Sequence, residues 1–315
     1  MAIAFIFPGQ GSQEVGMGSE LATAFPSARR VFEEVDEALG EKLSDVLWNG
    51  PKDRLTLTEN AQPALMAVSM AVIRVLEAEH GFRLADKVAF VAGHSLGEYS
   101  ALAAAGTFSL ADAARLLRTR GQAMQAAVPV GQGAMAALLG VGLDVAARVA
   151  TEAAGDEVCQ VANDNEPTQV VLSGHKAAVE RVAEIGKKYG VRRAMMLPVS
   201  APFHCALMQP AADAMAEALS RVEMRAPSVP VIANVLAQPI SDPARIRQSL
   251  IEQVTDTVRW RECVERMVAG GVTDFYEIGS GKVLAGLVRR VVKDANASSI
   301  GTPADLDGAA ALLQG

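Results

Sequence analysis

Short apolar runs rich in β-branched residues alternate along the chain with longer, alanine-rich amphipathic runs. This alternation is typical of an α/β protein with a parallel sheet. The short runs predict strands at residues 2–7, 87–92, 230–235 and 273–278. The longer runs predict helices at residues 61–79, 96–105, 110–127, 206–222, 244–254, 260–269 and 283–292. Asn60 and Ser109 stand where N-caps of two of these helices are expected.

The middle of the chain has a different order of elements. Its pattern predicts strands at 133–139, 157–163, 169–173 and 192–199, and helices at 143–154 and 176–189. The order β-α-β-β-α-β is that of a ferredoxin-like unit. We therefore predict a small ferredoxin-like subdomain over residues 129–199, inserted into a larger α/β subdomain formed by residues 1–128 and 200–315. A ligand site is expected where the two meet.

Composition narrows the class of protein. The chain has 315 residues, of which 50% are hydrophobic and 21% charged, and its formal net charge is −7. The negative charge disfavours nucleic acid as a partner, and no run reaches the roughly 18 uninterrupted apolar residues of a membrane helix. Three scattered cysteines form no CxxC pair or Cys/His cluster, so neither a disulfide framework nor a metal site is expected. These features predict a cytoplasmic protein without a metal ion.

A serine framed by glycines follows the predicted strand at 87–92, in the run Gly93-His94-Ser95-Leu96-Gly97. A strand, a GxSxG motif and a helix in this order form a sharp turn that projects the serine hydroxyl. The helix that begins near Leu96 would place backbone N–H groups beside that hydroxyl, where they can stabilise an oxyanion. Ser95 is therefore the predicted nucleophile of an acyl-transfer reaction.

A serine hydroxyl needs a neighbouring base, and the chain has four histidines. His80 ends a helix, His175 opens one, and His94 is adjacent to Ser95 and badly aimed for proton transfer. His204 lies in a loop between a predicted strand and a helix, where functional residues collect, and is the predicted base. No acidic residue is an obvious third member of a triad. We expect a Ser–His dyad whose imidazole is oriented by a carbonyl or an amide, with Gln253 and Asn234 as candidates.

Several ordered motifs carry a resemblance to a known family. The chain resembles the bacterial malonyl-CoA:acyl carrier protein transacylases of type II fatty acid synthesis and is similar to the acyltransferase domains of polyketide synthases. The resemblance covers nearly the whole chain. Its motifs are Phe7-Pro8-Gly9-Gln10-Gly11-Ser12-Gln13, Gly93-His94-Ser95-Leu96-Gly97-Glu98-Tyr99, Arg120-Gly121 with Met124-Gln125, Gly133-Ala134-Met135, Asn163 and Asn165, Pro202-Phe203-His204, and Glu277-Ile278-Gly279.

The resemblance implies a hydrolase-like α/β core with the ferredoxin-like insert, and it implies roles for single residues. Ser95 would be the nucleophile and His204 the general acid and base, and the backbone amides of Gln10 and Leu96 would form the oxyanion hole. Arg120 would bind the malonyl carboxylate. The other positions implied to support the site or contact substrate are Gln253, Asn163, Asn165, Met124 and Phe203.

Physical chemistry adds to the resemblance at two of these positions. Malonyl differs from acetyl by one carboxylate, and a planar guanidinium can hold that group with two parallel hydrogen bonds. Arg120 would therefore select as well as bind. The Phe203 ring would crowd the additional methyl group of methylmalonyl, so it favours malonyl.

The resemblance also implies the partners: malonyl-CoA as donor, the phosphopantetheine thiol of acyl carrier protein as acceptor, and no cofactor. We expect a monomer. Since carrier protein is acidic and this chain is net negative, docking needs a local basic rim, for which the candidates are Lys187, Lys188, Arg192, Arg193, Arg289, Arg290 and Lys293. Three alternatives stay open: a serine hydrolase or thioesterase, an acyltransferase of a polyketide or malonate decarboxylase system, and a catalytically silent scaffold that only binds carrier protein.

Overall fold

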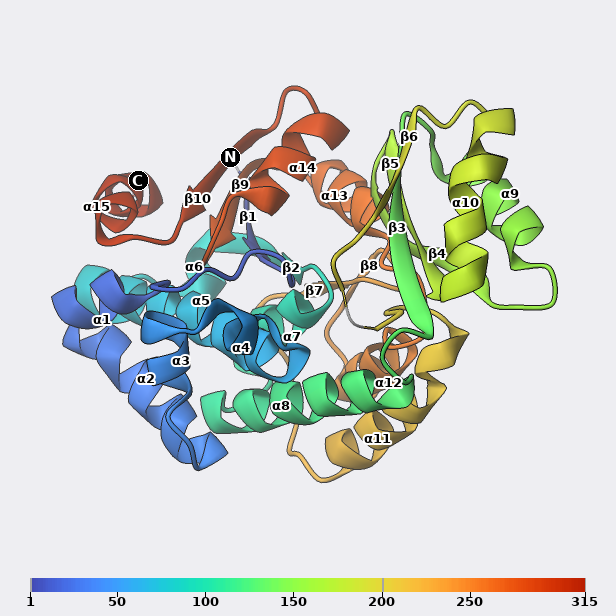
Figure 1. The fold of residues 1–315 in the computed structure, drawn as a ribbon. Helices are drawn as coiled ribbons and strands as arrows, with labels where there is room; N and C mark the ends of the chain where they lie inside the picture. The colour runs from blue at the N-terminus through green and yellow to red at the C-terminus, as the bar shows by residue number, and fades with distance from the viewer. Residues whose placement is uncertain (1, 200, 315) are drawn as a thin grey trace.

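Two β-sheets organise the chain in the computed structural model, which describes residues 2–199 and 201–314. The larger sheet has six strands in the order β10-β9-β1-β2-β7-β8, and all neighbours are parallel except the antiparallel pair β7–β8 (Figure 1). This arrangement confirms the predicted α/β class with a mostly parallel sheet. The strands are β1 (Ala2–Phe7), β2 (Val88–Gly93), β7 (Val231–Ala233), β8 (Gln238–Ile240), β9 (Val272–Ile278) and β10 (Asn296–Ile300).

The smaller sheet is antiparallel, with the order β4-β5-β3-β6, and two helices pack against it. In chain order its elements alternate as β-α-β-β-α-β, so the predicted ferredoxin-like unit is confirmed. It stands beside the larger sheet at one side of the molecule (Figure 1). Its elements are β3 (Gly133–Leu139), α9 (Leu143–Ala154), β4 (Cys159–Glu166), β5 (Gln169–His175), α10 (Lys176–Lys188) and β6 (Arg193–Met196). The division at 128/129 and 199/200 stays a prediction, and Ser200 lies outside the described residues.

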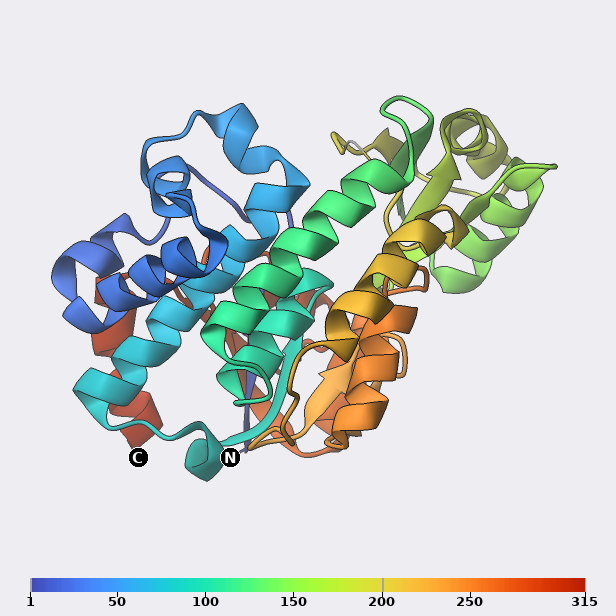
Figure 2. The ribbon, with the colours of Figure 1, turned by 90° about the horizontal axis from the view of Figure 1, so that it is seen from below.

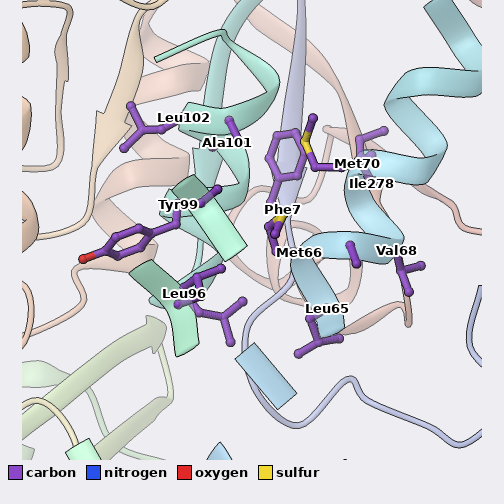
Figure 3. Close-up of a cluster of buried hydrophobic side chains, with 14 of the residues drawn as sticks. Phe7, Leu65, Met66, Val68, Met70, Leu96, Tyr99, Ala101, Leu102 and Ile278 are labelled. Atoms are coloured by element: carbon purple, nitrogen blue, oxygen red, sulfur yellow. The ribbon is translucent and has the colours of Figure 1, made fainter. Parts of the chain in front are cut away.

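Helices cover both faces of the larger sheet, so its central strands are buried on both sides. In β1 the side chains alternate: Phe5 and Phe7 belong to one buried cluster, and Ala4 and Ile6 to another on the opposite face. Figure 3 shows Phe7 among side chains of α5 and α7. The helices are α1 (Ser19–Ala24), α2 (Pro26–Leu39), α3 (Leu43–Asn49), α4 (Lys52–Thr56), α5 (Thr58–His80), α6 (Leu84–Lys87), α7 (Leu96–Ala104), α8 (Leu110–Ala127), α11 (Gln209–Ser220), α12 (Pro243–Glu252), α13 (Trp260–Ala269), α14 (Val283–Val291) and α15 (Pro303–Gln314), with a 3₁₀ turn at Ala206–Met208.

Helix α5 is the central helix of this core. It has 23 residues and is long and apolar enough to cross a membrane by length and composition alone. However, 83% of its most apolar window is buried inside the protein, where α5 packs against α2, α7 and α8. Figure 2 shows α8 between α5 and α11. Helix α5 is therefore a buried core helix in the helical layer beside the larger sheet.

One of the two predicted caps is confirmed. The Ser109 hydroxyl accepts a hydrogen bond from the Asp112 N–H at 3.0 Å and caps α8. The prediction that Asn60 caps α5 is wrong, because α5 begins at Thr58 and Asn60 lies inside its first turn. The Asn60 amide instead donates to the carbonyl of Arg54 at 2.8 Å and ties α5 to α4.

Two predicted strands of the small sheet have different lengths in the structure. β6 covers Arg193–Met196 only, short of the predicted 192–199, since Pro198 cannot donate to a ladder. β4 extends to Glu166, beyond the predicted 163, through a polar stretch that the hydrophobic pattern did not mark. That stretch is stabilised by the larger subdomain: Asp164 accepts from Arg261 at 2.8 Å, and its N–H donates to the Val258 carbonyl at 3.0 Å. Side-chain and backbone pairing thus joins β4 to α13 and to the loop before it.

Candidate active site

Ser95 sits in a strained turn between β2 and α7. Its backbone has φ 55° and ψ −110°, a conformation that residues other than glycine rarely adopt. Neither flanking glycine has room for a side chain. A Cβ on Gly97 would lie 2.2 Å from the Phe7 carbonyl oxygen, and one on Gly93 would lie 1.9 Å from the Gly97 carbonyl carbon. The chain therefore packs tightly enough to hold the serine hydroxyl above the sheet.

His204 contacts the serine. Its Nε2 is 2.8 Å from Ser95 Oγ, and its Nδ1 is 2.8 Å from the backbone carbonyl of Gln253. Because a carbonyl only accepts, Nδ1 carries the proton and Nε2 is left with a lone pair toward the hydroxyl. Burial, with a smaller effect of the Arg120 charge, lowers the pKa of His204 to about 3, so the ring is neutral at physiological pH. The orienting group is thus the carbonyl of one of the two candidates, Gln253, and not an amide side chain.

Arg120 reaches the same hydroxyl from α8. Its Nη2 donates to Ser95 Oγ at 3.1 Å and to Gln253 Oε1 at 2.8 Å, and its Nη1 donates to Gln62 Oε1 at 2.8 Å. The side chain is 1% exposed, and its guanidinium carbon is 5.7 Å from the centre of the Tyr99 ring. These three acceptors are neutral, so none of these hydrogen bonds is made to an anion, and the guanidinium can pair with an anionic group that enters beside Ser95.

A buried network behind the serine contains Asn234, which contacts Ser95 rather than orienting His204, and Glu98, for which no role was predicted. Asn234 accepts from the Ser95 N–H at 2.8 Å and donates to the Gly93 carbonyl at 2.7 Å. Glu98 accepts from the Asn234 N–H at 3.0 Å and from Gln253 Nε2 at 2.8 Å. Both side chains are fully buried. The signal for Glu98 was available in the sequence: it is a carboxylate inside the otherwise apolar run of α7.

A cavity of about 480 Å³ opens in front of Ser95, between the two sheets. Five of the predicted residues line it besides Ser95, His204 and Arg120: Gln10, Leu96, Met124, Asn163 and Phe203. Leu96 is the first residue of α7, where a backbone N–H has no acceptor within the helix. Gln253 lies behind this lining. Asn165 also lies outside it, and its Oδ1 is 2.9 Å from His94 Nε2, which links β4 to the serine turn.

The predicted basic rim is partly neutralised. Lys187 pairs with Glu184 and Lys188 with Glu152, each at 2.8 Å. Arg193 opens β6 and is exposed, a few residues before Leu197 at the cavity. Arg289 of α14 donates to the Ala297 carbonyl. Within the described part of the chain no group of three or more His, Cys, Asp or Glu side chains could hold a metal ion.

Comparison with known proteins agrees with this geometry. The family model described as "Acyl transferase domain" matches residues 4–306. The chain is 45% identical to the malonyl CoA-acyl carrier protein transacylase of Salmonella typhimurium over 306 residues, 97% of this chain and 98% of the relative. It superposes on the solved acyl-carrier-protein-S-malonyltransferase of Bartonella henselae with a TM-score of 0.97 and 58% identity, covering 100% of both chains. A solved malonyl-transacylase in complex with a type II PKS acyl-carrier protein is 42% identical, with a TM-score of 0.95, and covers 99% of this chain and 100% of that one. The chain belongs to the acyl transferase domain family.

Proposed function

We propose that this protein transfers a malonyl group from malonyl-CoA to the phosphopantetheine thiol of an acyl carrier protein, through an ester on Ser95, and so supplies fatty acid synthesis. The observation that carries the proposal is the double contact of one hydroxyl. Ser95 Oγ is 2.8 Å from a neutral imidazole nitrogen and 3.1 Å from a buried guanidinium. The first contact activates a nucleophile, and the second places a cation where an acyl group with a free carboxylate would lie.

The first half-reaction forms the ester. His204 Nε2 accepts the Ser95 proton as Oγ attacks the thioester carbonyl of malonyl-CoA. The resulting oxyanion is stabilised by the backbone N–H groups of Gln10 and Leu96, which both line the cavity. The carbon–sulfur bond then breaks, the imidazolium returns the proton to the leaving thiolate, and CoA departs.

The second half-reaction releases the ester. The carrier's phosphopantetheine thiol gives its proton to His204, and its sulfur attacks the malonyl ester. The same two amides hold the second oxyanion, the ester bond breaks, and Ser95 Oγ recovers the proton from the imidazolium. Ping-pong kinetics follow from this sequence, and no step requires a metal ion or a redox cofactor.

Two side chains would select the acyl group. Arg120 would pair with the malonyl carboxylate, and an acetyl group would leave this buried cation without its charged partner. Phe203 is 8% exposed and lines the cavity beside His204, where its ring limits the room for an α-methyl group. The expected preference is malonyl over both acetyl and methylmalonyl.

The relatives' names support the choice of acceptor. They name acyl carrier protein as the partner, and one solved structure holds a polyketide-type carrier. A polyketide carrier is therefore the second candidate acceptor. We place the reaction in the cytoplasm, on a monomer, with a carrier docked against the exposed cations Arg192 and Arg193, because the neighbouring lysines are already paired. Charge reversal at these two arginines should raise the KM for carrier at least about tenfold at low salt. An unchanged KM would contradict this docking surface.

Intact mass spectrometry tests the function directly. The native enzyme, mixed with malonyl-CoA, should gain one malonyl mass, and Ser95→Ala should gain none. Added holo-carrier should remove the adduct and become malonylated. Release of free malonate at the same rate without carrier would indicate a hydrolase. No adduct on the native enzyme would support a scaffold and refute the proposal.

A further inference from the structure

Glu98 is a buried carboxylate that neither half-reaction uses. It lies on the first turn of α7, three residues after Ser95, and is fully buried. Its Oε2 accepts two hydrogen bonds, from the Asn234 N–H and from Gln253 Nε2. Its Oε1 has no hydrogen-bond partner in the described part of the chain. A carboxylate is costly to bury in this way, and its hydrogen-bond partners indicate what it contributes to the site.

The Gln253 amide is the partner that contacts two residues of the cavity lining, Ser95 and Arg120. Its NH₂ group faces acceptors: Glu98 Oε2 at 2.8 Å and the Ser95 carbonyl at 3.0 Å. Its Oε1 faces the Arg120 guanidinium at 2.8 Å. Rotating the amide by 180° would place an oxygen against these acceptors and an NH₂ group against a guanidinium, so every contact would become repulsive. Glu98 therefore supplies an acceptor that fixes which end of the amide points at Arg120.

The direction of the amide decides where the guanidinium points. Arg120 Nη2 is shared between Gln253 Oε1 and Ser95 Oγ. If Gln253 Oε1 were lost, Gln62 Oε1 on Nη1 and the serine hydroxyl would remain as acceptors, and the fork could turn away from the acyl position. A misplacement of about 1 Å is enough to weaken bidentate recognition substantially.

We propose that Glu98 is a positioning residue for acyl selectivity: it orients the Gln253 amide, and through it the Arg120 guanidinium, toward the substrate carboxylate. This inference rests on the proposed function. The charges are consistent with it. Burial raises the pKa of Glu98 to about 7, against the opposing effects of the Asn234 and Gln253 hydrogen bonds and the Arg120 charge. The Gln253 amide thus stands between a buried cation and a buried acid, polarised by both.

The test compares acylation of Ser95 by malonyl-CoA and by acetyl-CoA, because acetyl has no carboxylate for Arg120. In Glu98→Met the acceptor is lost, and the ratio of the malonyl rate to the acetyl rate should fall by about tenfold or more. Glu98→Gln keeps an oxygen toward both donors and should retain the ratio within about threefold. Glu98→Asp withdraws the carboxylate by one methylene and keeps the position polar, so it should also lower the ratio. It takes the place of Glu98→Met if that variant does not fold.

A matched control separates positioning from stability. Glu277 on β9 is also fully buried, accepts from a backbone N–H at 2.8 Å with one oxygen, and has no described partner for the other. The melting temperature of Glu277→Met need not match that of Glu98→Met, but its malonyl-to-acetyl ratio should equal that of the native enzyme. In an Arg120→Ala background, Glu98→Met should change the ratio no further.

The outcomes distinguish the proposed function from the positioning role of Glu98. No malonyl adduct on the native enzyme would refute the proposed function. A native adduct with an unchanged ratio in folded Glu98→Met or Glu98→Asp would refute the positioning role alone. A further fall of the ratio in the Arg120→Ala background would also refute it, because Glu98 would then act by another route.

Discussion

Removing the Arg120 guanidinium should abolish the distinction between malonyl and acetyl. The side chain is 1% exposed, and its three hydrogen bonds end on neutral oxygen atoms of Gln62, Gln253 and Ser95. In the native enzyme the incoming carboxylate is thus the anion that this cation can pair with directly. Arg120→Ala would leave the malonyl carboxylate desolvated beside Ser95 without a partner.

The size of the effect follows from the burial. Breaking a buried ion pair by removing one partner costs about 3–5 kcal/mol. The cleft is open at its mouth, so we take the lower end, about 3 kcal/mol, which corresponds to about 100-fold in kcat/KM for malonyl-CoA. Acetyl-CoA cannot lose this pairing and should change by less than about tenfold, through the lost contact with Ser95 Oγ. Arg120→Lys keeps the charge but loses the fork, so we expect an intermediate loss of about tenfold.

Rapid-quench measurement of the acyl-Ser95 adduct gives both rates on the same sample. The acetyl rate serves as the internal reference for the state of Ser95 and His204. A malonyl-to-acetyl ratio in Arg120→Ala within about threefold of the native ratio would refute the assignment of the guanidinium to carboxylate recognition.

Three further predictions address the turn, the buried acid and the cavity wall. Gly97→Ala should abolish acylation, because its Cβ would lie 2.2 Å from the Phe7 carbonyl oxygen. Gly286→Ala on α14, where the added Cβ would be 3.6 Å from the Arg290 guanidinium, is the control and should stay active. Because the native state raises the pKa of Glu98 from 4.5 to about 7, it holds a proton that the unfolded chain gives up. The free energy of unfolding of the native enzyme, relative to that of Glu98→Gln, should therefore fall by up to about 3 kcal/mol between pH 5 and pH 8, measured by urea unfolding. The same difference between the two proteins at both pH values would contradict the raised pKa. Phe203→Ser should increase acylation by methylmalonyl-CoA relative to malonyl-CoA at least about fivefold by adduct mass, and an unchanged ratio would exclude the ring as a steric gate.

Local pattern was enough to predict part of the architecture. The elements of the small sheet follow from short apolar runs and helical periodicity between glycine and proline boundaries, and the strand–GxSxG–helix order of the serine turn is contained in a dozen residues. The short helices α1, α3 and α4 were not predicted, since five to seven residues are too few to show a period. The edge strand β10 was also not predicted, because its sequence is polar and it is defined by pairing with β9.

A site residue could be predicted only where its residue type indicates its chemistry or where a family motif contains it. His204 was reached by elimination among four histidines, and Arg120 through a family motif. Asn234 was a candidate for orienting His204, but it accepts from the Ser95 N–H instead, and Glu98 was given no role. The contacts of Glu98 with Asn234 and Gln253 join residues 136 and 155 positions apart in the sequence. Buried hydrogen bonds between such distant segments leave no period in the sequence.

Gln253 explains how parts from three distant segments are held in one geometry. Its carbonyl orients His204, its Nε2 binds the Ser95 carbonyl, and its Oε1 binds Arg120. Ser95 and His204 both have positive φ, with values of 55° and 58°, a strain that persists only where surrounding contacts enforce it. Because one fully buried residue contacts all three groups, nucleophile, base and cation cannot shift independently, and the same amide that maintains the dyad also sets the direction from which an acyl carboxylate is recognised.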